Sequence, residues 1–302
     1  MTLFANIFVN NILPAFLVIG AGVLLDRKFR VDKKSLSRTA LYVLTPCLVF
    51  SLTLESTVDS STFGLMILFA GGITLVMCAI GLAVGRLLRW PPRTADALVL
   101  SVAFLNAGNL GLSVILFSFG EVGLELASAF FVASVISCNT LAAFFAARSS
   151  GGARKAVLKV FKLPSLYAFP VALLLRALSV EVPEVLLKPT SLIARASVPI
   201  MLMMLGLQLS QTRLGGRYKE VSVAVVLRLV IGPLAAIGLA RLMGLQGLAS
   251  KVAITEASMP TAVTSLLMAI EFDGDADYVS SVIFVSTLLS ALTLTVLLSL
   301  LS

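Results

Sequence analysis

The feature that most constrains this chain is its series of long apolar segments. A hydrophobic stretch needs about 20 residues to cross the roughly 30 Å of hydrocarbon in a bilayer. Ten such stretches follow one another with short loops between them: 3–25, 36–54, 63–88, 97–119, 122–147, 160–179, 189–210, 220–243, 249–270 and 277–300. Because backbone in contact with lipid must satisfy its own hydrogen bonds, we expect an all-α polytopic membrane protein with ten transmembrane helices.

The placement of basic residues predicts how the chain is oriented. The net charge is +8, although only 13% of the residues are charged and 59% are hydrophobic. Lysine and arginine gather after the first, third, fifth and seventh stretches, and none follows the second or the fourth. The positive-inside rule then puts the basic loops in the cytoplasm and both termini outside, in a multi-pass protein of the plasma (inner) membrane. This orientation accounts for the charge, so we expect the bilayer and not a nucleic acid as partner.

The residue types argue against an enzyme. The chain contains no histidine, which removes the commonest proton shuttle and metal ligand. Its three cysteines all fall within apolar stretches, at spacings that suit neither disulfides nor a metal site. No phosphate-binding G-x-x-x-x-G-K-[ST] stretch occurs, so transport would have to use gradients or the membrane potential. We expect no cofactor beyond a coupling ion, Na⁺ or H⁺.

An internal repeat is visible at a shift of 153 residues, which places Pro46 on Pro199 and "FVASVIS" (131–137) on "FVSTLLS" (284–290). Five stretches per half mean that the second half enters the membrane from the opposite face. Such inverted repeats are common in secondary transporters. We expect a first five-helix repeat over 1–147, a short cytoplasmic linker over 148–159 and a second, inverted repeat over 160–302.

The same shift aligns two interrupted stretches. "FLNAGNLGL" (104–112) falls on "ASMPTAVTS" (257–265). Gly108 and Gly111 weaken the fourth helix, and Pro260 interrupts the ninth. Paired interruptions of this kind indicate a binding site at the middle of the membrane, where half-helix N-termini favour anions and freed carbonyls favour a cation.

These motifs resemble those of the auxin efflux carrier family, in its bacterial permease branch. The resemblance rests on N-x-G-N-x-G (106–111), "ASMP" (257–260), the prolines of the second and seventh stretches and "FVSTLLSALTLTVL" (284–297). It covers essentially the whole chain, although Ser113 stands where the family usually has a proline and the central loop is short.

The resemblance implies a fold similar to that of the bile acid–sodium symporters, with helices 4 and 9 crossing as broken helices. Helices 3–5 and 8–10 would form a mobile transport domain, and helices 1, 2, 6 and 7 a scaffold through which a homodimer can form. The implied mechanism is an elevator-type movement, and the implied substrates are organic anions such as malate, malonate or an auxin-like acid.

Candidate substrate ligands lie at and near the breaks. The amides of Asn106 and Asn109 can contact a substrate or cap the broken helix ends, and Asn106 matches the crossover asparagine of the family. Arg228, inside the eighth stretch, can grip a carboxylate, form a salt bridge or reach the interface with its charged end. The predicted substrate-binding residues are Asn106, Gly108, Asn109, Arg228, Pro260 and Thr261.

Glu256 is the only acid deep within a predicted span. A carboxylate at this depth is costly and needs a partner. Three roles stay open: a Na⁺ ligand together with freed carbonyls, a proton carrier, or an ion-pair partner of an arginine. We place ion coupling at Glu256 and Ser258. The sequence thus predicts a secondary carrier of a small organic anion, with an anion channel or a non-transporting membrane sensor as alternatives.

Overall fold

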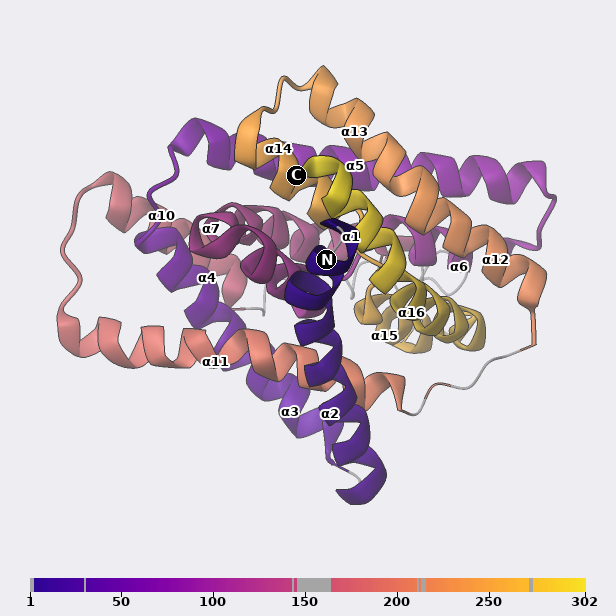
Figure 1. Ribbon diagram of the computed structural model, residues 1–302, viewed down its shortest axis with the longest axis horizontal. Coiled ribbons are helices and arrows are strands. Elements are labelled where there is room, and N and C mark those ends of the chain that lie inside the picture. The colour runs from indigo at the N-terminus through magenta and orange to yellow at the C-terminus, as the bar shows by residue number, and fades with distance from the viewer. Residues whose placement is uncertain are drawn as a thin grey trace.

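The computed structural model describes residues 3–29, 31–142, 144–145, 164–210, 212, 216–271 and 274–302 (Figure 1). Its α-helices and its π-helical turns, labelled η, are α1 (Leu3–Ile7), η1 (Phe8–Ile12), α2 (Leu13–Phe29), α3 (Lys33–Thr39), η2 (Ala40–Leu44), α4 (Thr45–Leu54), α5 (Ser60–Leu87), α6 (Pro92–Ala103), η3 (Ala107–Gly111), α7 (Leu112–Ser137), η4 (Cys138–Ala142), α10 (Ser165–Ala177), α11 (Glu184–Leu209), α12 (Tyr218–Val226), η5 (Leu227–Ile231), α13 (Gly232–Leu242), α14 (Gly247–Ala257), α15 (Val263–Glu271) and α16 (Ala276–Leu301).

Seven continuous helical stretches of the described chain are long and apolar enough to cross a membrane. They are Leu3–Phe29, Ser35–Leu54, Ser60–Leu87, Ala107–Ala142, Glu184–Leu209, Tyr218–Leu242 and Ala276–Leu301. This confirms an all-helical polytopic protein. The count of ten transmembrane helices and the inverted repeat stay predictions, and the predicted linker 148–159 lies outside the described residues.

The difference of three spans has local causes, one of which is that the predicted span 160–179 contains only the shorter apolar helix Leu166–Ala177. The predicted fourth span is interrupted after α6, and its second part continues into the fifth as one stretch, Ala107–Ala142. Within that stretch Gly120 has a left-handed φ of 68°, which glycine adopts readily and which breaks the helical path. The predicted ninth span is divided into α14 and α15, with 11 and 9 residues. Helices this short cannot cross the hydrocarbon singly.

Three of the π-helical turns lie just before a proline. Turns η1, η2 and η5 end two residues before Pro14, Pro46 and Pro233. Proline has no N–H to donate, and its ring collides with the carbonyl four residues earlier. A widened turn relieves that collision while keeping the helix continuous.

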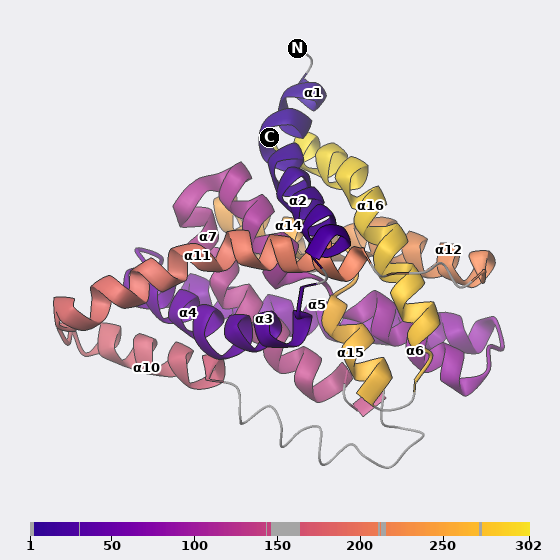
Figure 2. The same ribbon diagram turned by 90° about the horizontal axis from the view of Figure 1, so that it is seen from below.

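The helices pack as two groups. In the first, α11 lies against α2 and α4, and α10 lies against α4. In the second, α5 packs on α6, α7, α13 and α14, while α16 packs on α6, α12 and α15. The first group, apart from α2, lies to the left and the second largely to the right in both views (Figures 1 and 2). Contacts of α7 with α4 and α10, and of η3 with α11, join the groups.

Two glycines bring α2 and α11 together closely. A Cβ on Gly206 would overlap the carbonyl oxygen of Ile19, and a Cβ on Gly22 would overlap that of Met203. Small residues at such contacts let helix backbones approach and pack within a membrane. This crossing ties the first and the last helix of the first group.

One ion pair shows that two distant loops share a face. Arg217, just before α12, pairs with Asp275, the N-cap of α16, and its Nη2 donates to the Thr94 hydroxyl at 3.0 Å. Arg93 donates to the Gly274 carbonyl at 2.9 Å. Asp275 therefore neutralises Arg217, and Arg93 binds the backbone of the same loop.

Candidate functional site

The first break follows α6. That helix ends at Ala103, Phe104 is extended, and the helical path resumes at Ala107. Asn106 occupies the N-cap position, and its Oδ1 accepts a hydrogen bond from the Asn109 N–H at 3.2 Å. Asparagine is among the best N-cap residues because its side-chain oxygen satisfies an otherwise unpaired N–H of the first turn. The capping role anticipated for Asn106 is thus present, and it uses only the amide oxygen.

The second break separates α14 from α15. Residues 258–262 are non-helical around Pro260, which has no N–H to continue α14. The Ser258 hydroxyl donates to the Ile254 carbonyl at 2.6 Å. Ser258 is therefore occupied by its own helix, the usual arrangement for a hydroxyl in a membrane helix.

The two broken segments cross and pair through their backbones. The Asn106 N–H donates to the Pro260 carbonyl at 2.8 Å, and the Ala262 N–H donates to the Phe104 carbonyl at 2.9 Å. These bonds make an antiparallel bridge between Leu105 and Thr261. The crossing therefore satisfies backbone groups that an interrupted helix would leave unpaired, as a chain in lipid requires.

Further hydrogen bonds fix Thr261 at the crossing. Its Oγ1 donates to the Ser101 carbonyl at 2.6 Å, and its N–H donates to the Ser286 hydroxyl at 3.3 Å. Thr261 and Pro260 are completely or almost completely buried and do not line the cavity described below. Both residues therefore hold the two broken segments together through hydrogen bonds.

Arg228 connects the ends of the two half-helices. It is fully buried on η5, its Nη1 donates to the Val102 carbonyl at 2.7 Å, and its Nη2 donates to the Ala257 carbonyl. Val102 and Ala257 stand in the last turns of α6 and α14, so one cation faces two helix C-termini. Each C-terminus carries about half a negative charge. The guanidinium thus has two helix dipoles as counter-charges, and its predicted role as a substrate ligand stays a prediction.

Glu256 lies beside the start of the other half-helix. It is 0% exposed, and neither carboxyl oxygen has a hydrogen-bond partner within the described part of the chain. Its carboxyl group fills the space next to Gly111, where an added Cβ would overlap Oε2 and stand 2.8 Å from Oε1. Gly111 belongs to the first turn after the break, which is the positive end of a helix.

A second acid is also buried within a helix. Asp26 is 5% exposed near the end of α2 and accepts a hydrogen bond from the Ser210 hydroxyl. Asp26 lies one residue beyond the predicted end of the first span, in the last turn of α2, which packs against α11. That Glu256 is the only acid deep within a span stays a prediction.

A cavity of about 210 Å³ lies beside the crossing, and we call it the crossing cavity. Much of its wall is apolar, with Leu105, Phe131, Val135, Met201, Met204, Val263, Leu267 and Met268. Its polar residues include Ser37, Thr45, Asn106, Asn109, Ser134, Gln208 and Thr264. Among the described residues that line it, none is charged. Both helix groups contribute, so the cavity lies at their boundary.

Two amide atoms in this wall have no partner. Nδ2 of Asn106 and Oε1 of Gln208 are buried and make no hydrogen bond to any described residue. A buried amide without a partner is costly, so these atoms are available to a ligand. Gln208 is not among the site residues predicted from the sequence. The feature of the sequence that could have pointed to Gln208 is a single amide side chain near the C-terminal end of an apolar helix.

The predicted site residues thus divide into two sets. Asn106, Gly108 and Asn109 line the crossing cavity, and Gly108 makes room for the ring of Phe131. The others are not among its lining residues: Gly111, Arg228, Glu256, Ser258, Pro260 and Thr261. These residues lie at or next to the two breaks, outside the cavity wall, and several of them hold the crossing together through hydrogen bonds.

Comparison with known proteins identifies the family of this chain. The family model for membrane transport proteins matches residues 7–156 and 153–298. An uncharacterized transporter of Methanothermobacter thermautotrophicus is 32% identical over 199 residues, which cover 65% of each chain. An uncharacterized transporter of Methanocaldococcus jannaschii is 28% identical over 267 residues, covering 86% of each chain. The match covers nearly the whole chain, so this protein belongs to the membrane transport protein family, the auxin efflux carriers that its motifs resemble.

Proposed function

We propose that the protein is a secondary carrier of a small organic anion and that the crossing cavity is its substrate site. The observation that carries this proposal is the Nδ2 group of Asn106, a buried donor without a partner in the wall of a cavity at two crossing broken helices. Such a donor suits a carboxylate oxygen. The first turn after Asn106 adds the positive end of a helix.

The wall of the crossing cavity supports a choice among organic anions. It contains many apolar side chains, three of them methionines, and the described lining residues include no lysine or arginine. Methionine adapts to irregular ligands, and apolar walls disfavour a second carboxylate that would lack a partner. We therefore place an auxin-like acid, with one carboxylate on an apolar body, ahead of malate and malonate.

The two helix groups support an alternating-access mechanism. Asn106 and Phe131 belong to the group that contains both broken helices, whereas Met201 and Gln208 belong to α11 in the other group. A displacement of the first set against the second would open the cavity to one side of the membrane at a time. This is the elevator-type movement, with inverted repeats and a scaffold of helices 1, 2, 6 and 7, that the resemblance implies.

Counterflow in proteoliposomes tests the proposal. Vesicles loaded with unlabelled indole-3-acetate should accumulate the labelled acid transiently, and labelled malate and malonate should accumulate less. A channel would dissipate the gradient without counterflow, which would favour that alternative. A non-transporting sensor would show no protein-dependent flux for any of the three acids.

We further propose that Glu256 couples transport to H⁺ or Na⁺. An ionised carboxylate that is buried without partners costs several kcal/mol, so the group needs a proton or a cation. Transport by the wild type should depend on pH or on Na⁺, and Glu256→Gln should abolish that dependence while the protein still folds. Retention of the full ion dependence by Glu256→Gln would assign the residue a structural role only.

A further inference from the structure

A second cavity lies between the helix groups, on the other side of the crossing level. It has a volume of about 870 Å³, and we call it the acidic cavity. The crossing cavity is lined by the start of α4 and the last part of α11, whereas the acidic cavity is lined by the end of α4 and by residues 191–202 of α11, which lie earlier in that helix. Helix α7 lines both. The acidic cavity therefore opens toward the face that the charge pattern predicts to be outside.

Charged groups in this cavity are mostly negative. Three carboxylates line it, those of Glu55, Glu121 and Glu125, together with the guanidinium of Arg195. Oε2 of Glu125 is already occupied, because it accepts from the Ser56 hydroxyl at 2.9 Å and from the backbone N–H that follows it. A net negative lining attracts cations and repels anions.

The other carboxylates have capacity left for a ligand. Oε1 of Glu55 accepts from the Ser191 hydroxyl at 3.1 Å, which leaves its second oxygen. Glu121 has no partner among the residues that the structure describes. No three acidic, cysteine or histidine side chains of the described residues are grouped as metal ligands. The three carboxylates are thus not gathered as ligands of one metal ion, and the cavity has the size of an organic molecule.

A buried hydroxyl points independently to a ligand. Ser51 lines the acidic cavity, is only 4% exposed, and its Oγ makes no hydrogen bond to any described residue. Most serines in membrane helices donate to their own backbone. A hydroxyl that does not do so is free to accept from a bound N–H donor.

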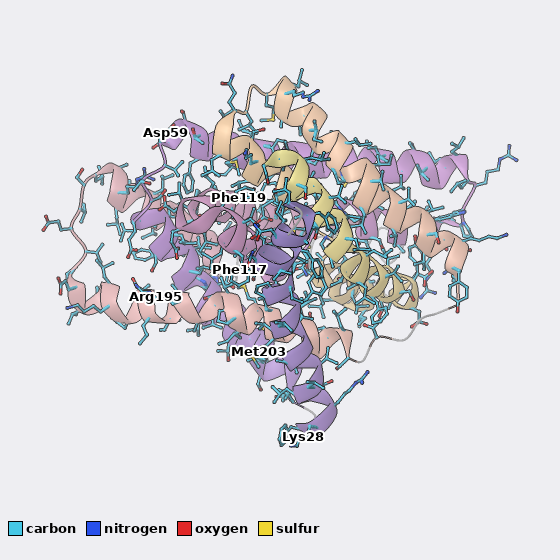
Figure 3. All side chains as sticks on the ribbon, viewed as in Figure 1. Lys28, Asp59, Phe117, Phe119, Arg195 and Met203 are labelled. Atoms are coloured by element: carbon cyan, nitrogen blue, oxygen red, sulfur yellow. The ribbon has the colours of Figure 1, made fainter. Side chains whose placement is uncertain are left out.

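The remaining wall suits an apolar body with a cationic end. Leu48, Leu52 and Leu124 line the cavity, and so does Phe117, a residue that is 38% exposed. Aromatic faces attract ammonium groups. Figure 3 marks Phe117 on α7 and Arg195 on α11, the helices of the two groups between which the cavity lies.

We infer that the acidic cavity is a binding site for a small organic cation, an apolar body carrying an ammonium group. The ammonium group meets the carboxylates of Glu55 and Glu121 and the Ser51 hydroxyl, and the body lies on the leucines and Phe117. Because α7 belongs to one helix group and α4 and α11 to the other, the bound cation bridges the groups and resists their relative movement. This last consequence rests on the proposed transport mechanism, whereas the binding itself does not.

Binding is tested with 2-phenylethylammonium, 2-phenylethanol and 3-phenylpropionate, three ligands of similar body and different charge. The melting temperature of the purified protein should rise with 2-phenylethylammonium by mass action and much less with the other two. Raising the salt from about 0.05 M to about 0.5 M should weaken the effect because the site is partly open to water. Equal shifts with the alcohol, or no shift with the cation, would overturn the proposal.

Point variants locate the site. Glu121→Gln and Glu55→Gln should each weaken binding roughly fivefold, the size expected of a partly exposed ion pair. Ser51→Ala should weaken it also, while leaving the unliganded protein at least as stable because a buried unpaired hydroxyl is removed. Glu181→Gln, an exposed glutamate not among the cavity-lining residues, serves as the matched control. Unchanged affinity in all three cavity variants, or an equal loss in the control, would show that the cation binds elsewhere.

Discussion

The carboxyl group of Glu256 occupies the space in which a side chain at residue 111 would stand. With glycine at residue 111 the two half-helices fit together, and the Glu256 carboxyl lies against the first turn of the other half-helix. The conformational freedom of glycine is not what this position requires, since its φ is −59°. It requires the absence of a Cβ. The crossing and the buried acid are therefore a single packing unit.

Gly111→Ala should lower the free energy of unfolding by about 1 to 3 kcal/mol, the usual cost of adding a methyl group to a filled interior. Denaturant or thermal unfolding of the detergent-purified protein measures it. Gly71→Ala is the matched control, because a Cβ at Gly71 meets no atom within 4 Å and alanine favours a helix. In Gly111→Ala/Glu256→Ala the loss should be smaller than the sum of the two single changes. Additive effects would show that the two residues do not compete for space.

Arg228→Met should destabilise the protein by about 2 kcal/mol or more, because two buried carbonyls at helix ends lose their donors. Arg228→Lys keeps the positive charge but cannot donate to both carbonyls with the planar geometry of a guanidinium. Its free energy of unfolding should therefore lie between those of the wild type and Arg228→Met. Arg241→Met changes an exposed arginine at the end of α13 and is the control. If Arg228→Met folded with unchanged stability and lost only transport, Arg228 would act as a substrate ligand.

Substitution of Asn106 separates its two amide atoms. Serine also caps helices well, so Asn106→Ser should keep the bond from the Asn109 N–H and remain close to the wild type in stability. Serine lacks the amide N–H donor, so transport by Asn106→Ser should fall about tenfold or more. This is the loss expected when a buried charge-assisted hydrogen bond is removed. Asn106→Ala should lose transport and, in addition, about 1 kcal/mol of stability. Uptake assays and melting curves are read together, with Asn10→Ala, an exposed asparagine, as the control. Normal transport by Asn106→Ser would contradict the proposed substrate contact.

Asp59 makes stability depend on pH at the start of α5. The Ser61 hydroxyl and the Thr62 N–H donate to its carboxylate and hold its pKa well below the ordinary value of 3.8. A group whose pKa is lowered by folding stabilises the folded state above its unfolded pKa and loses that effect as the pH falls. The wild type should thus melt at a higher temperature than Asp59→Asn near neutral pH, and the difference should shrink below about pH 4. Ser61→Ala should reduce the difference near neutral pH. If the difference in melting temperature between the wild type and Asp59→Asn grew on acidification, the ionised carboxylate of Asp59 would not be what stabilises the start of α5.

Several features follow from local sequence alone. The apolar stretches predict α5 and α11 to within a few residues, because the preference of a side chain for lipid or water is a property of that residue. Both breaks also lie where the sequence places the poorest helix formers, after Ala103 and around Pro260. Proline and glycine change the backbone regardless of what packs around them.

Other features are decided only by the tertiary structure. The sequence marks Arg228 and Glu256 as unusual, yet it does not tell that the arginine meets two helix C-termini and that the acid lies against Gly111. Gln208 and Phe131 acquire their place at the cavity in the same way. Burial and hydrogen-bond partners depend on which helices meet, and at what height. The hydropathy of a segment determines that it lies in the membrane. The partner of each buried polar group depends on how helices that are distant in the sequence pack together.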